Sequence, residues 1–205
     1  MEQFEGHYTQ WRANRMKFIF NIFKPETFMG KTVLLLGDGQ GDIGNEFYKA
    51  GAITTSVEGR REHINKGMER FPHLRFLHTD INNYEIEGQY DFIISMGILY
   101  HLKRPRFHLN EICQHGKVII LESEILDLNK PVVKYVKEGS WYDQGLDFKG
   151  CKPTEMYIEN IFKKNNRKFT KYMSKELNSN IHQYDWESKN DGTALNGRRR
   201  LWVIN

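Results

Sequence analysis

The sequence is poor in cysteine, with only Cys113 and Cys151 among its 205 residues. Two cysteines are too few for a disulfide scaffold, and neither belongs to a C-x-x-C pair. The eight histidines are scattered, without the H-E-x-x-H or H-x-x-x-H spacing that places two ligands on one helical face. We therefore expect two reduced thiols and no bound metal.

Long apolar runs are also lacking. No stretch approaches the ~20 residues that cross a bilayer, and the polar, acidic start of the chain is unlike a secretory signal. The net charge of +4 permits a nucleic-acid partner without favouring one. We expect a cytoplasmic globular protein with a small-molecule partner and no membrane contact, and the sequence does not indicate its oligomeric state.

Glycine, by contrast, is concentrated after the first apolar segment. Residues 33–44 read Val-Leu-Leu-Leu-Gly-Asp-Gly-Gln-Gly-Asp-Ile-Gly, which predicts a buried strand, a glycine-rich turn and a helix. Glycine suits a turn that needs positive φ or that must lie against a ligand without an intervening Cβ. The segment is typical of a nucleotide-like cofactor site, although tight turns in other α/β proteins offer a plainer explanation.

Acidic residues follow the next two predicted strands. Glu58 comes directly after a strand over 53–57, where a carboxylate can accept hydrogen bonds from both hydroxyls of a ribose. This pairing suits NAD and S-adenosylmethionine equally well. Asp80 follows a strand over 75–78 and is placed to accept a hydrogen bond from an adenine amino group. A fourth strand is predicted over 91–95.

Together these features resemble the class I S-adenosylmethionine-dependent methyltransferases over about residues 30–125, and more weakly to the end of the chain. The sequences Tyr-Asp-Trp at 184–186 and Arg-Arg-Arg-Leu-Trp at 198–202 are similar to those of a small group of phage and bacterial members whose acceptor is unassigned. The resemblance implies S-adenosylmethionine as the cofactor. The cofactor-binding residues that it implies are Gly37, Asp38, Gly39, Gly41, Glu58, Gly59, Arg60, Asp80, Ile81, Ser95, Met96 and Gly97.

The chain departs from the family pattern at one position. The family usually carries an acidic residue two positions before the first glycine of the turn, where this chain has Leu35. That carboxylate normally orders the turn and the polar end of the cofactor, so its loss predicts weaker binding. Asp38 and Asp42, within the turn, are the candidates to replace it.

Strands alternate with helical stretches between residues 31 and 121, which predicts parallel strands joined by right-handed crossovers. With the family resemblance, we expect an α/β fold with a Rossmann-like, seven-stranded, mostly parallel sheet and an antiparallel last strand. We also expect an N-terminal covering helix and two long substrate-side loops, at 123–152 and 174–200. A single domain over 1–205 would comprise a helical cover (1–29), a cofactor-binding half (30–122) and a substrate-side half (123–205).

The candidate catalytic residues are His101 and Glu122. His101 lies in the segment after the fourth strand, which faces the acceptor in the family, and imidazole titrates near neutrality. Hydrogen bonding to backbone at a helix start is the alternative role for His101. Glu122 ends the fifth predicted strand and could receive an acceptor's hydroxyl or amine. Tyr8 and Arg12 on the first helix, and Trp141, Tyr142, Asp143, Tyr184 and Trp186 in the loops, are the candidate substrate-side residues.

Motifs that are absent restrict the acceptor. Ser95 is followed by Met-Gly instead of the Pro-Pro-aromatic signature of enzymes that methylate exocyclic base amines, and neither cysteine follows a proline, as attack on pyrimidine C5 would favour. We therefore expect methyl transfer to an oxygen, carboxylate or nitrogen of a small molecule. The alternatives are a non-catalytic protein that binds S-adenosylmethionine, an RNA-binding protein that uses Arg198–Arg200 with nearby aromatics, and an NAD-dependent oxidoreductase.

Overall fold

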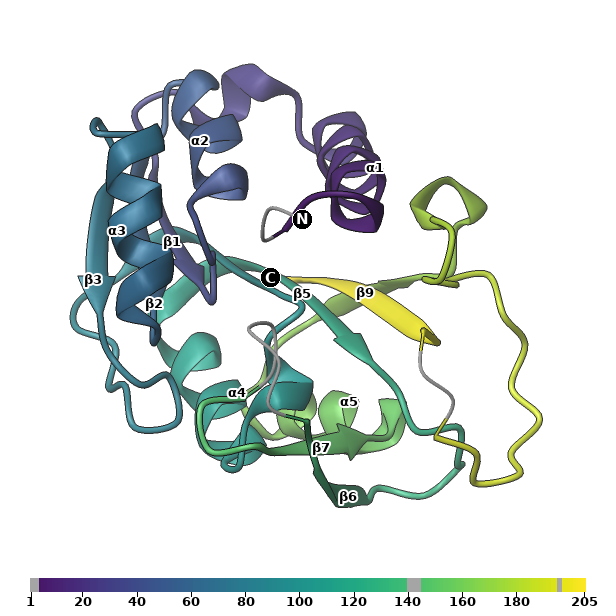
Figure 1. Cartoon of the computed structure of the whole chain (residues 1–205). Coiled ribbons are helices and arrows are strands. Elements are labelled where there is room, and N and C mark those ends of the chain that lie inside the picture. The colour runs from purple at the N-terminus through teal and green to yellow at the C-terminus, as the bar shows by residue number, and fades with distance from the viewer. Residues whose placement is uncertain (1–3, 140–144, 195–196) are drawn as a thin grey trace.

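A seven-stranded sheet forms the centre of the protein in the computed structural model, which describes residues 4–139, 145–194 and 197–205 (Figure 1). Neighbouring strands from β3 to β5 run parallel, whereas β9 runs antiparallel to both β5 and β8. This arrangement confirms the predicted fold class. In spatial order the strands are β3 (Arg75–His78), β2 (Ile53–Glu58), β1 (Thr32–Leu36), β4 (Tyr90–Met96), β5 (Gly116–Glu124), β9 (Arg199–Ile204) and β8 (Phe169–Tyr172).

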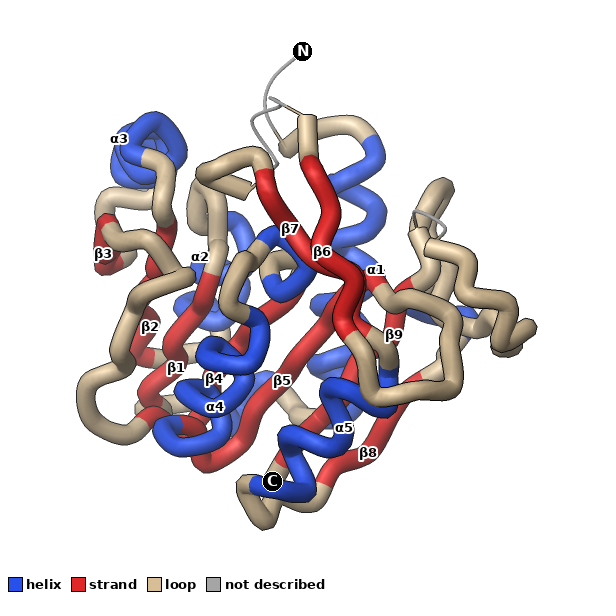
Figure 2. Tube along the Cα trace, turned by 90° about the horizontal axis from the view of Figure 1, so that it is seen from below, coloured by secondary structure: helices blue, strands red, loops and turns tan. Residues whose placement is uncertain are grey.

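Helices cover both faces of this sheet. On one face lie α4 (Pro105–His115) and α5 (Glu155–Lys164), which stand in front of the strands when the protein is viewed from below (Figure 2). On the other lie α1 (His7–Ile22), the predicted N-terminal cover, and α2 (Asp42–Lys49). A further helix, α3 (Arg61–Arg70), follows β2. Among the described residues, no helix is long and apolar enough to cross a membrane.

The central strands are apolar on both faces because each face packs on a different core. In β4, Ile93 joins the cluster beneath α4 and α5, whereas Phe92 and Ile94 join the cluster beneath α1 and α2. Side chains alternate between faces along a strand, so a strand covered on both sides becomes a continuous apolar run. This is the pattern that made β1, β4 and β5 recognisable in the sequence.

The segment 123–152, expected as a long loop, contains nearly all of a two-stranded ribbon. In this ribbon β6 (Val133–Lys137) pairs antiparallel with β7 (Lys149–Pro153). The ribbon packs on the short 3₁₀ turn η2 (Leu99–His101), where Cys151 donates to the carbonyl of Leu99 at 3.4 Å. A Cβ at Gly150 would collide with the Tyr100 carbonyl and the Glu138 carboxylate, so glycine permits this close approach.

The second long segment, 174–200, contains the short turn η3 (Lys175–Leu177) and an isolated bridge between Gln183 and Arg198. A third 3₁₀ turn, η1 (Pro25–Phe28), connects α1 to β1. Helix α5 begins after Thr154, whose hydroxyl caps it by accepting a hydrogen bond from the Tyr157 amide at 3.2 Å. The segment 123–152 thus leaves the sheet at the end of β5 and returns beside η2. The segment 174–200 leaves the sheet after β8 and returns at β9.

Candidate cofactor cleft and polar hollow

The turn between β1 and α2 adopts backbone conformations that favour glycine. Gly37, Gly39 and Gly41 have φ values of 75°, 61° and 87°. A Cβ at Gly37 would lie 2.8 Å from the Ile98 side chain, and one at Gly41 would lie 2.7 Å from Phe76. Glycine is therefore required here by both the backbone conformation and the available space.

Asp38 is the acidic residue that fastens this turn. Its carboxylate accepts a hydrogen bond from the Ser56 hydroxyl at 2.6 Å and from the Gly44 amide at 3.2 Å, so it ties the turn to β2 and to the start of α2. Burial raises the pKa of Asp38 to about 7, against the opposing effect of the Ser56 hydrogen bond. Leu35, only 2% exposed, packs in the core beneath α1 and α2. The acid is thus displaced by three residues from its usual family position.

Glu58 and Asp80 meet at one cavity of about 610 Å³ beside the turn, which we call the glycine-turn cleft. The Glu58 carboxylate accepts hydrogen bonds from the amides of Gly39 at 3.0 Å and Arg60 at 2.9 Å. The Asp80 carboxylate is held by the amide and side chain of Asn82, each at 3.0 Å. Of the cofactor-binding residues expected from the resemblance, those that line this cleft are Gly37, Gly39, Glu58, Gly59, Arg60, Asp80, Ile81 and Gly97.

The remaining expected cofactor-binding residues lie around the cleft. Asp38 and Met96 line an adjoining cavity of about 550 Å³ under α1. Gly41 packs against Phe76 behind the turn, and Ser95 is fully buried with its hydroxyl 2.8 Å from Nε2 of His108. Ser95 therefore contacts His108 of α4 and is not part of the lining of the cleft or of the cavity under α1.

The cavity under α1 is also lined by a buried arginine, Arg15. Arg15 is 4% exposed, and its Nε and Nη1 atoms have no hydrogen-bond partner among the described residues. Its guanidinium lies 3.7 Å from the centre of the Trp11 ring. Tyr8 and Arg12 line the same cavity, with Arg12 3.6 Å from the Asp42 carboxylate. A carboxylate entering this cavity would meet donors that lack a hydrogen bond, although Glu122 already lies 3.5 Å from Nη1 as a counter-charge.

His101 lies on the border between the cavities. It lines the glycine-turn cleft, the cavity under α1 and a third cavity of about 1080 Å³. Its Nδ1 atom lies 2.8 and 3.0 Å from the two carboxylate oxygens of Glu138, just after β6. A carboxylate can only accept, so Nδ1 carries the hydrogen and Nε2 is left as an acceptor. Glu138 was missed by sequence reasoning, since no motif links it to His101.

The third cavity, which we call the polar hollow, contains residues from both long segments. Glu124, Glu138 and Lys152 come from 123–152, and Ile181, His182, Gly197 and Arg199 come from 174–200. Burial and the charge of Arg199 lower the pKa of Lys152 to about 8. Burial, assisted by the same arginine, lowers the pKa of His182 to about 2, so this imidazole stays neutral. The hollow is therefore more polar than hydrophobic in its chemistry.

Glu122 is not the free carboxylate that the sequence analysis expected. It is fully buried, accepts a hydrogen bond from Nη1 of Arg199 at 2.9 Å and lies 3.5 Å from Nη1 of Arg15. The same Arg199 also donates to the Tyr100 hydroxyl at 2.9 Å. Glu122 thus neutralises two buried arginines, a structural role that corrects its assignment as a catalytic base.

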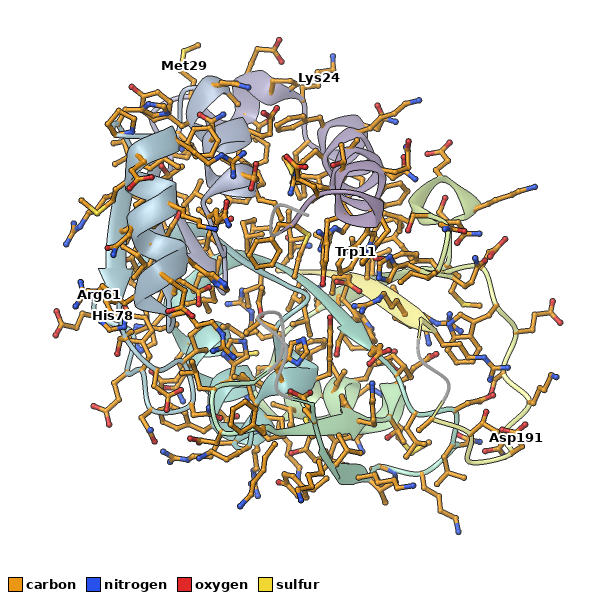
Figure 3. All side chains as sticks on the ribbon, in the orientation of Figure 1. Trp11, Lys24, Met29, Arg61, His78 and Asp191 are labelled. Atoms are coloured by element: carbon orange, nitrogen blue, oxygen red, sulfur yellow. The ribbon has the colours of Figure 1, made fainter. Side chains whose placement is uncertain are left out.

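Two of the aromatic residues expected to form acceptor walls, Tyr184 and Trp186, lie elsewhere. Tyr184 is fully buried, and its hydroxyl accepts a hydrogen bond from Nε1 of Trp11 at 2.7 Å. Trp11 is part of α1, and its ring faces β9, where the Arg199 guanidinium lies 4.5 Å from the ring centre (Figure 3). Trp186 lines a separate cavity beside Leu126 and donates to the Arg199 carbonyl at 3.1 Å. The other three expected wall residues, Trp141, Tyr142 and Asp143, fall outside the described residues.

The three consecutive arginines form ion pairs with acidic residues, and Arg199 and Arg200 are buried while Arg198 is half-buried. Arg198 pairs with Asp127 and Arg200 with Glu155, each at 2.8 Å, while Arg199 pairs with Glu122. Arg199 and Arg200 are 4% and 1% exposed. This arrangement contradicts the alternative in which these arginines form an exposed basic surface for RNA.

No family model matches the chain. Among curated proteins, it is 22% identical over 113 residues to the mitochondrial ubiquinone biosynthesis O-methyltransferase of Schizosaccharomyces pombe. That match covers 51% of this chain and 41% of the relative, so the chain spans less than half of the relative's length.

Solved structures resemble the chain over nearly its whole length. The N-terminal domain of EvdMO1 with SAH bound has a TM-score of 0.68 at 15% identity, covering 94% of this chain and 79% of that one. Magnesium protoporphyrin IX methyltransferase (ChlM) from Synechocystis PCC 6803 with bound SAH has a TM-score of 0.63 at 12% identity, covering 100% and 89%. The chain therefore has the fold of the class I S-adenosylmethionine-dependent methyltransferases.

Proposed function

We propose that the protein transfers a methyl group from S-adenosylmethionine to an oxygen of a small molecule. The observation that carries this proposal is the position of His101, which borders both the glycine-turn cleft and the polar hollow and is oriented by Glu138. A base at this boundary can reach an acceptor in the hollow that faces a cofactor in the cleft. The activity, the small-molecule acceptor and a cytoplasmic location are all parts of the proposal.

The residues present fit the cofactor. Gly37 and Gly39 bring the backbone of the turn to the wall of the cleft without side chains, and Glu58 keeps lone pairs for two ribose hydroxyls beyond its two amide hydrogen bonds. Asp80 is placed for the adenine, and the unsatisfied nitrogens of Arg15 suit the carboxylate of the methionine part. When bound, S-adenosylmethionine supplies an electrophilic methyl group, whose bond to sulfur breaks with its electron pair on sulfur as the acceptor oxygen bonds to carbon.

His101 supplies the base. The hydrogen bond from Nδ1 to Glu138 fixes the tautomer in which Nε2 can take the acceptor's proton, and Glu138 stabilises the imidazolium that forms. The second oxygen of Glu138 accepts from the Gly145 amide at 2.6 Å, which holds the carboxylate in place. Such a base contributes about 10²–10⁴-fold when the nucleophile must lose a proton.

The need for a base favours a hydroxyl over an amine as the acceptor. An uncharged amine already has a lone pair for attack, whereas a hydroxyl becomes a strong nucleophile only as its proton leaves. The curated relative is named an O-methyltransferase, which supports an oxygen acceptor. A glycopeptide N-methyltransferase with a TM-score of 0.59 has the same fold, so the fold alone does not decide the atom.

Calorimetric titration and product release test this function. S-adenosylhomocysteine should bind and NAD should not, because Asp80 and the cavity under α1 fit a methionine-bearing nucleoside. With an acceptor library scored by release of S-adenosylhomocysteine, His101→Asn should lose about 10²–10⁴-fold in turnover while retaining cofactor affinity. His115→Asn, in the last turn of α4, serves as the matched control. Absence of S-adenosylhomocysteine binding would contradict the cofactor, and full turnover by His101→Asn would contradict the base.

A further inference from the structure

We infer that the acceptor in the polar hollow is a neutral, polyhydroxylated small molecule, of the chemical class of the sugars. This inference rests on the proposed function, since it names the substrate class of the same site. It is carried by three properties of the hollow: the pairing of its charges, the covering of its aromatic rings, and the mixture of hydrogen-bond donors and acceptors on its wall.

The charges of the hollow are already paired. In the described part of the chain, each fully charged side chain on its wall has a partner: Lys152 pairs with Glu124, Arg199 pairs with Glu122, and Glu138 accepts hydrogen bonds from His101 and the Gly145 amide. The Lys152 and Glu124 side chains are only 14% and 7% exposed. A charged acceptor would have to break one of these pairs and leave the other partner buried without compensation, which is costly.

The aromatic rings of the hollow are already in contact with other groups. The Trp11 ring is stacked with His182 at 3.8 Å and contacts the Arg15 guanidinium at 3.7 Å. The Tyr100 ring contacts His101 at 4.1 Å and the Arg199 guanidinium at 4.7 Å. A flat aromatic acceptor would gain most by stacking on an open ring face. The Trp11 and Tyr100 rings offer none, since both side chains are buried, and the half-buried Tyr8 ring is already in contact with the rings of Phe4, His7 and Trp11.

The wall offers acceptors and donors side by side. Carboxylate oxygens of Glu124 and Glu138 only accept, whereas the ammonium of Lys152 and the guanidinium of Arg199 only donate. A ligand carboxylate could satisfy the donors alone, and a ligand ammonium could satisfy the acceptors alone. A hydroxyl both donates and accepts, so several hydroxyls can satisfy both kinds of group without disturbing any ion pair.

Two matched acceptors test the class without requiring turnover. Methyl α-D-glucopyranoside and its uronic acid differ only in a carboxylate at C6, and catechol represents a flat aromatic. The same neutral and acidic pair is prepared from galactose and mannose. With S-adenosylhomocysteine in excess, binding is followed by NMR of the histidine rings. We expect at least one neutral glycoside to shift the His101 and His182 signals with at least tenfold higher affinity than its uronic acid or catechol.

Charge variants test the same inference from the protein side. Glu124→Gln retains an oxygen for the Gly197 amide, which Glu124 accepts at 2.9 Å, but leaves Lys152 without a counter-charge. Affinity for the uronic acid should rise at least tenfold, reversing the preference. The exposed pair of α2 supplies the control, because Glu46→Gln leaves Lys49 unpaired outside the hollow and should change neither affinity.

The outcomes separate this inference from the proposed function. Tightest binding by a uronic acid or catechol, or no shift with any of the neutral glycosides, would overturn the acceptor class. An unchanged preference in Glu124→Gln would overturn the role of the Lys152 pair. Calorimetry with S-adenosylhomocysteine is measured on every variant. Its failure in the unmodified protein would contradict the cofactor proposal, whatever the glycosides do.

Discussion

The glycine-turn cleft and the polar hollow meet at His101, yet they are built differently. The cleft lies where consecutive parallel strands end, with its glycines on the turn after β1 and Glu58 holding the Gly39 amide. The hollow is formed by long charged and aromatic side chains from α1, η2, the ribbon and the approach to β9. A cofactor shared by a whole fold suits the first construction, whereas an individual acceptor suits the second.

The difference predicts that single substitutions affect the two regions separately. Changes in the cleft should act on cofactor affinity, because few residues contact the cofactor and each does so directly. Changes in and beneath the hollow should act mainly on acceptor preference or on stability, because its side chains form ion pairs and hydrogen bonds with one another and with neighbouring residues. The expected effects are ordered below from the largest to the smallest.

Glu58→Ala should produce the largest effect. It removes a charged acceptor from two ribose hydroxyls, each such hydrogen bond contributing about 1.5–3 kcal/mol. The affinity for S-adenosylhomocysteine should therefore fall by at least about 100-fold. Because Glu58 also holds the Gly39 amide, Glu58→Gln is the matched variant that keeps an oxygen for the turn and loses only the charge. Unchanged calorimetric affinity in Glu58→Ala would exclude the ribose role.

Leu35→Asp should destabilise the protein without restoring the family's usual site. Leu35 is 2% exposed and packs in the core under α1, and Asp38 already fastens the turn. An uncompensated buried carboxylate costs about 3–5 kcal/mol, which urea unfolding measures. Leu35→Met, which preserves volume, should cost less than about 1.5 kcal/mol. Tighter cofactor binding in a stably folded Leu35→Asp would show that the turn still lacks an acid.

Asp38→Asn should remove a pH dependence from the stability of the cleft. Burial raises the pKa of Asp38 from 3.8 to about 7, so between these values the folded state keeps a proton that the unfolded chain has lost. Protonated Asp38 therefore favours the folded state below pH 4, and this contribution to the free energy of unfolding is lost as pH rises to 7. The loss is at most about 4 kcal/mol before solvent screening is considered. The free energy of unfolding of Asp38→Asn should therefore rise relative to that of the unmodified protein as pH increases over this range.

Asp91 supplies a control of opposite sign for this experiment. Hydrogen bonds from Lys117 and Thr32 lower the pKa of Asp91 to about 2, so its contribution is present above pH 4 and lost as pH falls toward 2. Asp91→Asn should therefore be destabilised at neutral pH and approach the unmodified protein in acid. Parallel pH profiles for the two asparagine variants would contradict the assignment for Asp38.

The same contrast explains what could be predicted from the sequence. Strands β1, β4 and β5 are apolar on both faces, and the positive φ values of the turn require the glycines that mark it, so these local signals carried the fold and the cleft. The ribbon was missed because β6 has no buried residue and no apolar–polar alternation, and residues 138–148 separate it from its partner strand. Each element of the cleft could be recognised within a short stretch of chain.

The hollow depends on pairs that no short stretch reveals. His101 meets Glu138 across 37 residues, and Arg199 meets Glu122 across 77. A sequence shows that an acidic residue ends β5, but the arginines that neutralise it come from α1 and β9. Aromatic content likewise identified Tyr184 and Trp186 as notable residues, although it could not show that one lies in the core and the other beside a different cavity.

Tyr184→Phe should have the smallest effect. We expect it to change stability only through Trp11, which lines the hollow and donates to the Tyr184 hydroxyl. The substitution leaves Nε1 of the buried Trp11 without its acceptor, which costs about 1–3 kcal/mol in the free energy of unfolding. Tyr135→Phe, on the exposed face of β6, should change stability by less than about 0.5 kcal/mol. Cofactor affinity should stay within twofold in both variants, because Tyr184 supports the wall beneath Trp11 and touches neither cleft residue nor turn. If Tyr184→Phe were as stable as Tyr135→Phe but unable to bind S-adenosylhomocysteine, the prediction would be wrong. The polar hollow and the glycine-turn cleft would then be coupled, and a change beneath one would alter binding in the other.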